Sequence, residues 1–407
     1  MPAVILKQGR EKSLLRRHPW IFSGAIHHAD ENIASGSTVD LLSFNKQFLA
    51  RASYSPNSQI RTRVWTFEDE IVDKEFFRKR TRSAIAARSP LRLGEGLGVR
   101  SNALRLIYAE SDGIPGLIVD RYGDVLVLQS LTAGSEYWKE TFADILLEET
   151  RLHTIYERSD ADVRELEGLG PKVGILRGNL TSPALSNVEG FIFPITEHNL
   201  KFNINIEVGH KTGFYLDQSK NRLRVRELAK DKDVLDCFCY TGGFTVNALA
   251  GGAKSVLAID SSEEAIILAK ENVALNNPPV DQATFIEGDV FQLLRKFRDE
   301  NRSFDMIILD PPKFAPTAAQ AERAARGYKD INLYAFKLLR PGGILVTFSC
   351  SGGIDAGLFQ KIIAGAALDA GVDAQIVEHL SQNADHPVLL HFPEGAYLKG
   401  LICYKPG

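Results

Sequence analysis

Three short segments in the C-terminal half carry residue types that could do group-transfer chemistry. Residues 234–243 read Val-Leu-Asp-Cys-Phe-Cys-Tyr-Thr-Gly-Gly, an apolar stretch that ends in an acid and continues into glycines. Residues 310–314 read Asp-Pro-Pro-Lys-Phe, and residues 349–351 read Ser-Cys-Ser. We interpret the three as an S-adenosylmethionine site, a substrate loop and a cysteine that attacks a base. They predict a nucleic-acid methyltransferase that works through a covalent intermediate.

The predicted cofactor site follows from acids at the ends of successive strands. Asp236 ends the first strand, and the glycines after it let the backbone approach a ligand at a helix N-terminus. Asp260 lies 24 residues after Asp236, where an acid can accept hydrogen bonds from both ribose hydroxyls. Asp289 follows the third strand, near the expected adenine. The loop completes the predicted cofactor-binding set with Phe238, Tyr240, Thr241, Gly242 and Gly243, and Asp310 is included as well.

The same geometry could bind NAD. However, Phe238 and Tyr240 stand where a dinucleotide-binding loop of the G-x-G-x-x-G type has glycine. Any one of these acids could simply cap a helix. Because three acids follow in register and Asp310 comes after them, we favour S-adenosylmethionine.

Cys350 is the candidate nucleophile and Asp310 its catalytic partner. Cytosine C5 is too weak a nucleophile to take a methyl group unaided, and a thiolate that adds to C6 activates it. Both residues end neighbouring strands of the expected sheet, so they should face one site. The alternative is that Cys350 is a small buried residue without chemistry.

The overall composition is that of a globular protein with several domains. The chain has 407 residues, 44% hydrophobic and 24% charged, and two or three domains are expected. No apolar run is long enough to cross a bilayer, and four cysteines do not suggest a disulfide framework, so we expect a cytoplasmic protein without a membrane partner. Cys237 and Cys239 lack a second ligand pair for zinc, so we expect no metal.

Basic residues are concentrated near the N-terminus, which favours contact with RNA. Residues 1–105 contain 18 Lys and Arg against 10 Asp and Glu, a net charge of +8. Because the whole chain has a net charge of −3, residues 106–407 carry −11. Residues 60–65 alternate with period two, which predicts that Arg61 and Arg63 share one exposed face. The full predicted RNA set is Arg61, Arg63, Arg78, Lys79, Arg80 and Arg82, with Pro311, Pro312, Lys313 and Phe314 of the substrate loop.

The elements that must position these residues divide the chain into three predicted domains. Residues 1–72 look like short strands of a small β-barrel, and residues 73–188 like an α+β domain with a helix at 136–150. From residue 189 to 407, strands and helices alternate as in a doubly wound, Rossmann-like α/β sheet. Its seven strands are expected at 233–237, 255–259, 283–287, 304–309, 343–348, 374–377 and 397–404.

Over nearly its whole length the sequence resembles the bacterial 23S ribosomal RNA 5-methylcytosine methyltransferases of the RlmI type. The similarity is carried by residues 9–13, 17–26 and 209–222, and by the three motifs above. The resemblance implies an N-terminal PUA domain, a class I methyltransferase domain, 23S ribosomal RNA as substrate and Cys350 as nucleophile. It also implicates Tyr215, Gln218 and Arg222 in cofactor binding, and it is compatible with a homodimer.

One departure from RNA 5-methylcytosine enzymes at large concerns product release. Many of them carry a second cysteine after the proline of the fourth-strand motif, and this loop has none. A single-cysteine route is implied, in which the base that removes the C5 proton is unassigned and Asp310 is a candidate. Two alternatives stay open: an N7-guanine ribosomal RNA methyltransferase without covalent catalysis, and a non-catalytic RNA-binding assembly factor.

Overall fold

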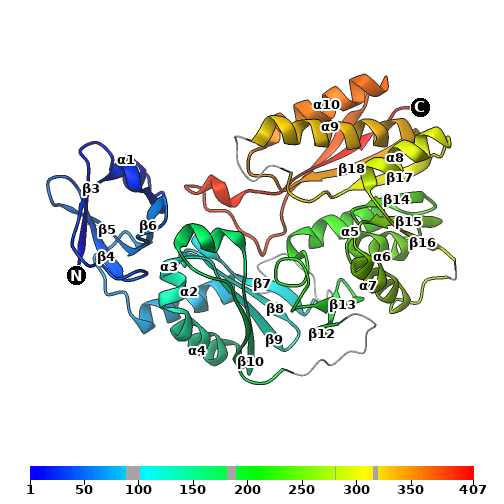
Figure 1. The fold of residues 1–407 in the computed structure, drawn as a ribbon. Coiled ribbons are helices and arrows are strands. Elements are labelled where there is room, and N and C mark those ends of the chain that lie inside the picture. Colours follow the sequence, from blue (N-terminus) through cyan, green and yellow to red (C-terminus); the bar gives the residue numbers. More distant parts are fainter. Residues whose placement is uncertain (89–100, 181–188, 280, 315–319) are drawn as a thin grey trace.

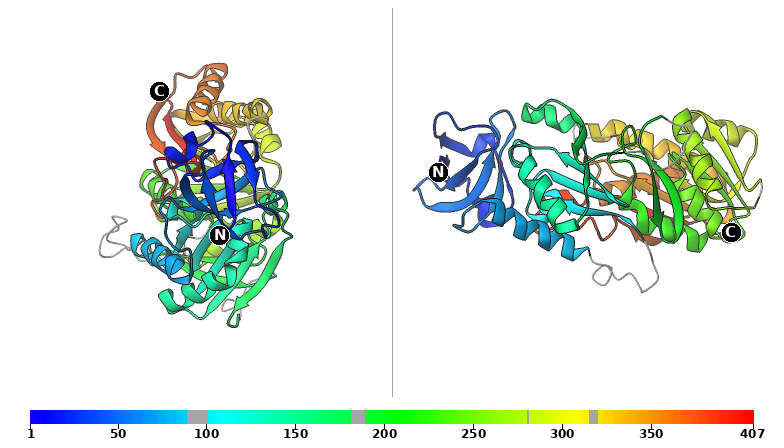
Figure 2. Two further views of the ribbon diagram at one scale, coloured as in Figure 1. Left: turned by 90° about the vertical axis from the view of Figure 1, so that its left-hand side faces the viewer. Right: turned by 90° about the horizontal axis from the view of Figure 1, so that it is seen from below.

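The computed structural model describes residues 1–88, 101–180, 189–279, 281–314 and 320–407. They form an elongated molecule with one sheet near the N-terminus, a second in the middle and a third at the opposite end (Figures 1 and 2). None of the described helices is both long enough and apolar enough to span a bilayer.

The N-terminal region is a six-stranded sheet with strand order β2-β6-β5-β4-β1-β3. Alternating apolar residues such as Val39 and Leu41 on β4 point into its core and are fully buried. A short helix, α1 (Lys12–Leu15), precedes β2. The strands are β1 (Ala3–Leu6), β2 (Trp20–Phe22), β3 (Ile26–Ala29), β4 (Thr38–Leu42), β5 (Phe48–Tyr54) and β6 (Ile60–Thr66).

The middle region begins at α2 (Lys74–Ala87), whose first turn is capped by the side chain of Asp73. Its five-stranded sheet has the order β11-β10-β9-β8-β7. The single helix expected at 136–150 is wrong in its bounds. Thr132 forms a capping box that starts α3 (Ala133–Tyr137), and α4 (Lys139–Thr150) follows after a break at Trp138. The strands are β7 (Ala103–Tyr108), β8 (Leu117–Tyr122), β9 (Val125–Ser130), β10 (Thr154–Ser159) and β11 (Lys172–Arg177).

A two-stranded hairpin leads into the C-terminal region. β12 (Ile192–Glu197) pairs with β13 (Leu200–Asn205) across a tight turn. His198 and Asn199 both adopt positive φ in this turn, as a two-residue hairpin loop with matching twist requires. The predicted domain boundary after residue 188 adjoins residues 181–188, which lie outside the described part of the chain.

The C-terminal region is the predicted seven-stranded sheet, with strand order β16-β15-β14-β17-β18-β20-β19. All neighbouring strands run parallel except those paired with β20, which is antiparallel to both β18 and β19. The order reverses between β14 and β17, so ligands are expected beyond the carboxyl ends of these strands. The strands are β14 (Asp233–Cys237), β15 (Ser255–Asp260), β16 (Ala283–Glu287), β17 (Phe304–Leu309), β18 (Leu339–Ser349), β19 (Gln375–Leu380) and β20 (Lys399–Tyr404).

Helices cover both faces of this sheet and bury its apolar strands (Figure 1). On one face lie α5 (Ser219–Leu228), α6 (Gly243–Ala250) and α7 (Glu263–Ala274). On the other lie α8 (Val290–Asp299), α9 (Ala321–Leu338) and α10 (Ala356–Ala370). This two-sided packing fixes the strand ends that carry the predicted site.

Candidate active site

The carboxyl ends of four neighbouring strands bring the predicted chemical residues to one edge of the sheet. Asp236 lies on β14, Asp260 ends β15, Asp310 follows β17 and Cys350 follows β18. These four strands are adjacent and parallel. The sequence motifs therefore converge in space, as strand-end positions in a doubly wound sheet must.

Asp236 is a fully buried acid with one carboxyl oxygen that has no hydrogen-bond partner. Its Oδ2 accepts a hydrogen bond of 2.6 Å from the Thr245 hydroxyl, while its buried Oδ1 has no partner. Burial, together with the negative charges of Asp310 and Asp260, raises the pKa of Asp236 to about 7, against the hydrogen bond from Thr245. A buried carboxyl oxygen without a partner is a group that a ligand donor can satisfy.

The loop after β14 is held in a strained conformation that opens its backbone to a ligand. Phe238, Tyr240 and Gly242 all have positive φ, of 62°, 49° and 80°. The Tyr240 amide donates to Asp260 Oδ2 at 2.8 Å, and the Ser262 amide donates to Oδ1 at 3.0 Å. A side chain at position 242 would meet Ala269, so glycine suits both the space and the backbone.

These residues fit S-adenosylmethionine. The buried Asp236 Oδ1 and Thr241 Oγ1 lack partners, and Gly243 opens α6 with its N-terminal amides at the same loop. Asp260 presents a partly exposed carboxylate at the neighbouring strand end. Asp289 differs from Asp260 in being more exposed, and it is the N-cap of α8, where its Oδ1 accepts from the Gln292 amide at 2.8 Å.

The segment before α5 lies against this site. Gln218 Nε2 donates to Asp310 Oδ2 at 3.0 Å, so the segment contacts the candidate catalytic acid directly. The Tyr215 ring meets the Tyr240 ring edge-on, with centroids 5.4 Å apart. Arg222 is buried, pairs bidentately with Glu197 at 2.6 and 2.7 Å, and donates to the Tyr215 carbonyl at 2.9 Å. Its guanidinium thus anchors the segment to β12.

Cys350 and Asp310 form an electrostatically linked pair. Burial raises the pKa of the Cys350 thiol, and the charge of Asp310 raises it further, whereas Lys211 and Lys313 oppose that rise. Burial and the charge of Asp217 raise the pKa of Asp310 to about 7. The site can therefore hold a proton near neutral pH, which suits acid–base chemistry.

Sequence reasoning missed several residues around this pair. Although burial acts to raise it, the pKa of Asp217 is held well below its usual range by Lys211, whose Nζ lies 2.7 Å from Oδ2, and Tyr397 donates to the same oxygen. Lys399 pairs with Ser349 across β18 and β20 and donates to the Ser351 carbonyl at 2.8 Å. Lys399 reaches this edge of the sheet through the pairing of β18 with β20, and no local sequence motif indicates that position.

The predicted exposed face carrying Arg61 and Arg63 is wrong for Arg63. This residue is only 4% exposed, and its guanidinium lies 2.9 Å from Glu167 of the middle region and 3.8 Å from Glu110. The period-two pattern identified the strand, but the second face of β6 packs on the middle region instead of facing solvent. Arg61 is half-buried and donates to the Pro56 carbonyl.

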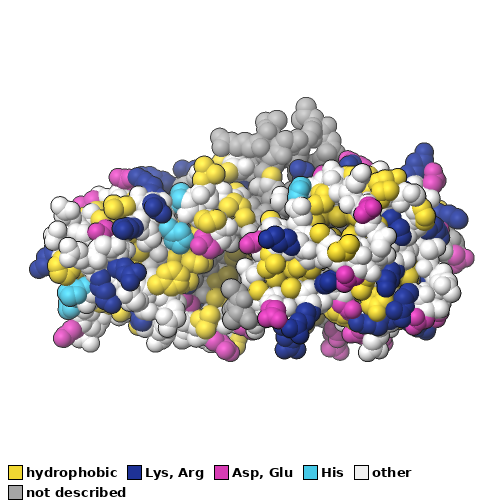
Figure 3. Space-filling model, turned by 90° about the horizontal axis from the view of Figure 1, so that it is seen from above, with side chains coloured by type: hydrophobic (Ala, Val, Ile, Leu, Met, Phe, Trp, Pro, Cys, Tyr) yellow, Lys and Arg dark blue, Asp and Glu magenta, His cyan; other side chains and the backbone are white. Residues whose placement is uncertain are grey.

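The basic run on α2 is largely neutralised by acids. Arg78 pairs with Glu148 and Arg82 with Glu149, both on α4, while Lys79 is exposed. Arg80 is half-buried, with its guanidinium 4.5 Å from the centroid of the Phe76 ring, and its buried Nε has no partner. On the face in Figure 3, Lys and Arg are interspersed with Asp and Glu rather than gathered into one basic field.

Only part of the Asp-Pro-Pro-Lys-Phe motif in the loop after β17 is exposed to solvent. Pro311 is buried, whereas Pro312 and Lys313 are exposed. Phe314 is half-buried and packs on Tyr328, with ring centroids 4.8 Å apart. The ring of Phe314 thus supports the loop from the α9 side.

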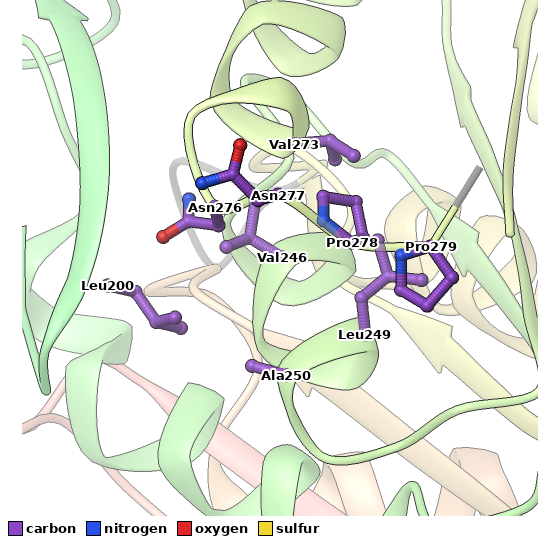
Figure 4. Close-up of a pocket in the computed structure, with 9 residues that line it drawn as sticks. All are labelled: Leu200, Val246, Leu249, Ala250, Val273, Asn276, Asn277, Pro278 and Pro279. Atoms are coloured by element: carbon purple, nitrogen blue, oxygen red, sulfur yellow. The ribbon is translucent and has the colours of Figure 1, made fainter.

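A pocket lined by α6, the end of α7 and the segment that follows α7 has none of these residues (Figure 4). It is lined by Leu200, Val246, Leu249, Ala250, Val273, Asn276, Asn277, Pro278 and Pro279. Within the described ranges, no cluster of three or more His, Cys, Asp or Glu side chains could hold a metal ion.

Comparison with known families agrees with this geometry. Residues 4–67 match a PUA-like domain, and residues 180–394 match an S-adenosylmethionine-dependent methyltransferase. These matches confirm the predicted N-terminal fold, the class of the C-terminal domain and its cofactor. The boundaries after residues 72 and 188 stay predictions.

Relatives and solved structures are similar along the whole chain. Ribosomal RNA large subunit methyltransferase I of Klebsiella pneumoniae is 49% identical over 99% of this chain and 98% of its own length, and that of Shewanella amazonensis is 50% identical over 98% of each. A Streptococcus mutans protein described as a SAM-dependent methyltransferase has a TM-score of 0.82 at 20% identity, covering 99% of this chain and 100% of its own. A structure described as a methyltransferase complexed with SAH has a TM-score of 0.84 at 20% identity, with the same coverage. The chain therefore belongs to the S-adenosylmethionine-dependent methyltransferases, in the family of the ribosomal RNA large subunit methyltransferases I.

Proposed function

We propose that this protein methylates C5 of a cytosine in 23S ribosomal RNA through a covalent adduct with Cys350. The observation that carries the proposal is the placement of Cys350 and Asp310 at adjacent strand ends, beside a loop that fits the methyl donor. The names of the relatives, which specify large-subunit ribosomal RNA, support the substrate class.

In this mechanism Cys350 Sγ, as the thiolate, forms a bond to C6 of the base and pushes electron density onto C5. S-adenosylmethionine supplies the electrophilic methyl group that C5 takes. Asp310, held by Gln218, contacts the edge of the cytosine and keeps its ring oriented against the thiol. Lys211 and Lys313 stabilise the thiolate against the burial that disfavours it.

The methyl donor would be held by the residues around the β14 loop. Asp236, Thr241 and the amides of Gly242 and Gly243 would receive its amino-acid part, and Asp260 its ribose. Tyr215 and Gln218 would line the opposite side. Arg222 would act indirectly, by anchoring their segment. Asp289 would have to bind adenine while it caps α8.

RNA would approach across the N-terminal region and the loop after β17. The cations available on this path include exposed Lys79 and Lys313, and Arg80 of α2 with its unpartnered Nε. The target would be single-stranded or locally opened, so that one base can enter the site. The proposal includes a cytoplasmic location and a homodimer, and light scattering would measure the latter.

The test is nucleoside mass spectrometry on protein-free 23S ribosomal RNA incubated with the protein and methyl-labelled S-adenosylmethionine. We expect label in 5-methylcytidine, and its loss in Cys350→Ala. Cys403→Ala is the matched control, because Cys403 is buried in the same sheet but has no place in the mechanism. Label in 7-methylguanosine, retained in Cys350→Ala, would replace the proposal by non-covalent N7 methylation. RNA binding without label would indicate an assembly factor.

A further inference from the structure

Lys399 is a half-buried cation on the far side of Cys350 from Asp310. In the sheet order β17-β18-β20, Asp310 follows β17, Cys350 follows β18 and Lys399 begins β20. The backbone pair Ser349–Lys399 sets the register, and Lys399 Nζ donates to the Ser351 carbonyl at 2.8 Å. Ser349, the register partner of Lys399, and Ser351, its hydrogen-bond acceptor, therefore lie on either side of Cys350 in sequence.

The surroundings of Lys399 make its ammonium group easier to deprotonate than that of an exposed lysine. Burial, together with the nearby charge of Lys313, lowers its pKa to about 8, although Cys350 and Asp355 act in the opposite direction. These three side chains come from the end of β18, the loop after β17 and the start of α10, and among the described residues no carboxylate forms a salt bridge with Lys399. An amine that is partly unprotonated near pH 8 can accept a proton.

The reaction needs a proton acceptor, and Asp310 already has another role in the proposed mechanism. Once methyl transfer is complete, C5 carries both the methyl group and its original hydrogen, and the adduct persists until that proton leaves. Asp310 is assigned to the edge of the base and is already bonded to Gln218. C5 is bonded to C6, the atom that Cys350 attacks, and Lys399 contacts the residues on either side of Cys350.

We propose that Lys399 is a further catalytic residue, the base that removes the C5 proton and releases the product. The neutral Nζ takes the proton and becomes an ammonium group. The electron pair of the C5–H bond forms the C5=C6 double bond, and the C6–S bond breaks to return the Cys350 thiolate. Atoms and electrons balance without any further reactant. This inference rests on the proposed function.

The experiment compares Lys399→Met and Lys399→Arg with wild type in the presence of 23S ribosomal RNA and S-adenosylmethionine. The measurements are 5-methylcytidine formed per minute and the fraction of protein in a denaturant-stable RNA adduct. We expect at least a 100-fold lower turnover in both variants, with accumulation of adduct. Arginine preserves the cation and a donor to Ser351 but cannot accept the proton.

Two controls separate this result from misfolding or a wrong reaction. Lys405→Met removes another half-buried lysine, which donates to carbonyls at the opposite end of β20, and should retain wild-type turnover. Adding Cys350→Ala to Lys399→Met should abolish the adduct.

The inference is overturned if Lys399→Arg turns over like wild type, or if the Lys399 variants lose turnover without accumulating adduct, since Lys399 would then act earlier. If wild type forms no 5-methylcytidine, the proposed function itself fails. If wild type forms it and Lys399→Met matches it, only the present inference fails.

Discussion

Asp310 and Asp217 lie close enough to influence each other's charge, yet their pKa values move in opposite directions. Burial and Asp217 raise the pKa of Asp310 to about 7 from 3.8. Asp217 stays ionised because Lys211 and Tyr397 bond its carboxylate. The chain thus keeps one acid protonated and one ionised at mildly acidic pH, a division of roles that environment sets in many active sites.

Asp310→Asn should raise the melting temperature at pH 8. The folded-state pKa of Asp310 lies above its unfolded value, so its contribution to stability is present below pH 4 and is lost as pH rises through 7. Removing the charge should recover on the order of 2 kcal/mol of unfolding free energy at pH 8 and less than half of that at pH 5. Thermal unfolding from pH 5 to 8.5 measures this.

Asp217→Asn provides the opposite control. Its depressed pKa means that the carboxylate stabilises the fold above its unfolded pKa near 4, and this variant should lower the melting temperature at both pH values. If the melting temperatures of the two variants shifted in the same direction at each pH, the assignment of Asp310 as the acid with the raised pKa would be contradicted.

At the residue scale, sequence could indicate acids and a cysteine at strand ends, because their place in the chain fixes their place in a doubly wound sheet. It could not indicate Lys399 or Asp217, whose neighbours come from distant strands and loops. It also misjudged Arg63, because a period-two pattern does not say which face another domain covers.

At the element scale, the segment from residue 209 to α5 depends on one buried ion pair. Arg222 and Glu197 are both nearly inaccessible and bond bidentately, and Arg222 also holds the carbonyl of Tyr215. Replacing Arg222 alone would leave the Glu197 charge buried without a partner, which is strongly unfavourable.

Arg222→Met should therefore cost about 3–5 kcal/mol of unfolding free energy in urea denaturation. Adding Glu197→Gln should recover part of that loss, because it removes the uncompensated charge. Arg326→Met, which breaks an exposed pair with Glu322, is the control and should cost less than about 1 kcal/mol. A full loss of cofactor binding in Arg222→Met with unchanged stability would instead indicate direct contact with the cofactor.

The strands of the C-terminal sheet were predictable because each is an apolar run bounded by turn signals. The ends of these strands were less predictable. β18 begins at Leu339, four residues before the expected strand, because Leu339, on the N-terminal side of Gly342 and Gly343, already pairs with β17. β19 runs to Leu380, three residues beyond the expected end, through pairing with β20. Pairing partners, not local propensity, set these limits.

At the scale of the whole molecule, residues 381–398 between β19 and β20 join all three regions. The buried Asp385 accepts a hydrogen bond of 2.9 Å from the Arg105 amide on β7, and Tyr108 donates to the Gly395 carbonyl at 2.9 Å. Phe392 meets Trp20 of the N-terminal sheet edge-on, with ring centroids 4.9 Å apart. The same connection leads directly into β20 and Lys399, so contacts between regions and the geometry of the site share one segment.

This coupling predicts cooperative unfolding. Wild-type protein should show one calorimetric transition, because the buried contacts of Asp385 bind the middle region to the C-terminal sheet. Asp385→Ala would leave the Arg105 amide without its acceptor and should split the transition in two. For the transition at the lower temperature, the free energy of unfolding should fall by about 1–3 kcal/mol. Glu394→Gln alters only an exposed contact with His18 and should leave one transition. A single, unshifted transition in Asp385→Ala would mean that the middle region and the C-terminal sheet are held together elsewhere, with the hydrogen bond from Tyr108 to the Gly395 carbonyl the first contact to remove next.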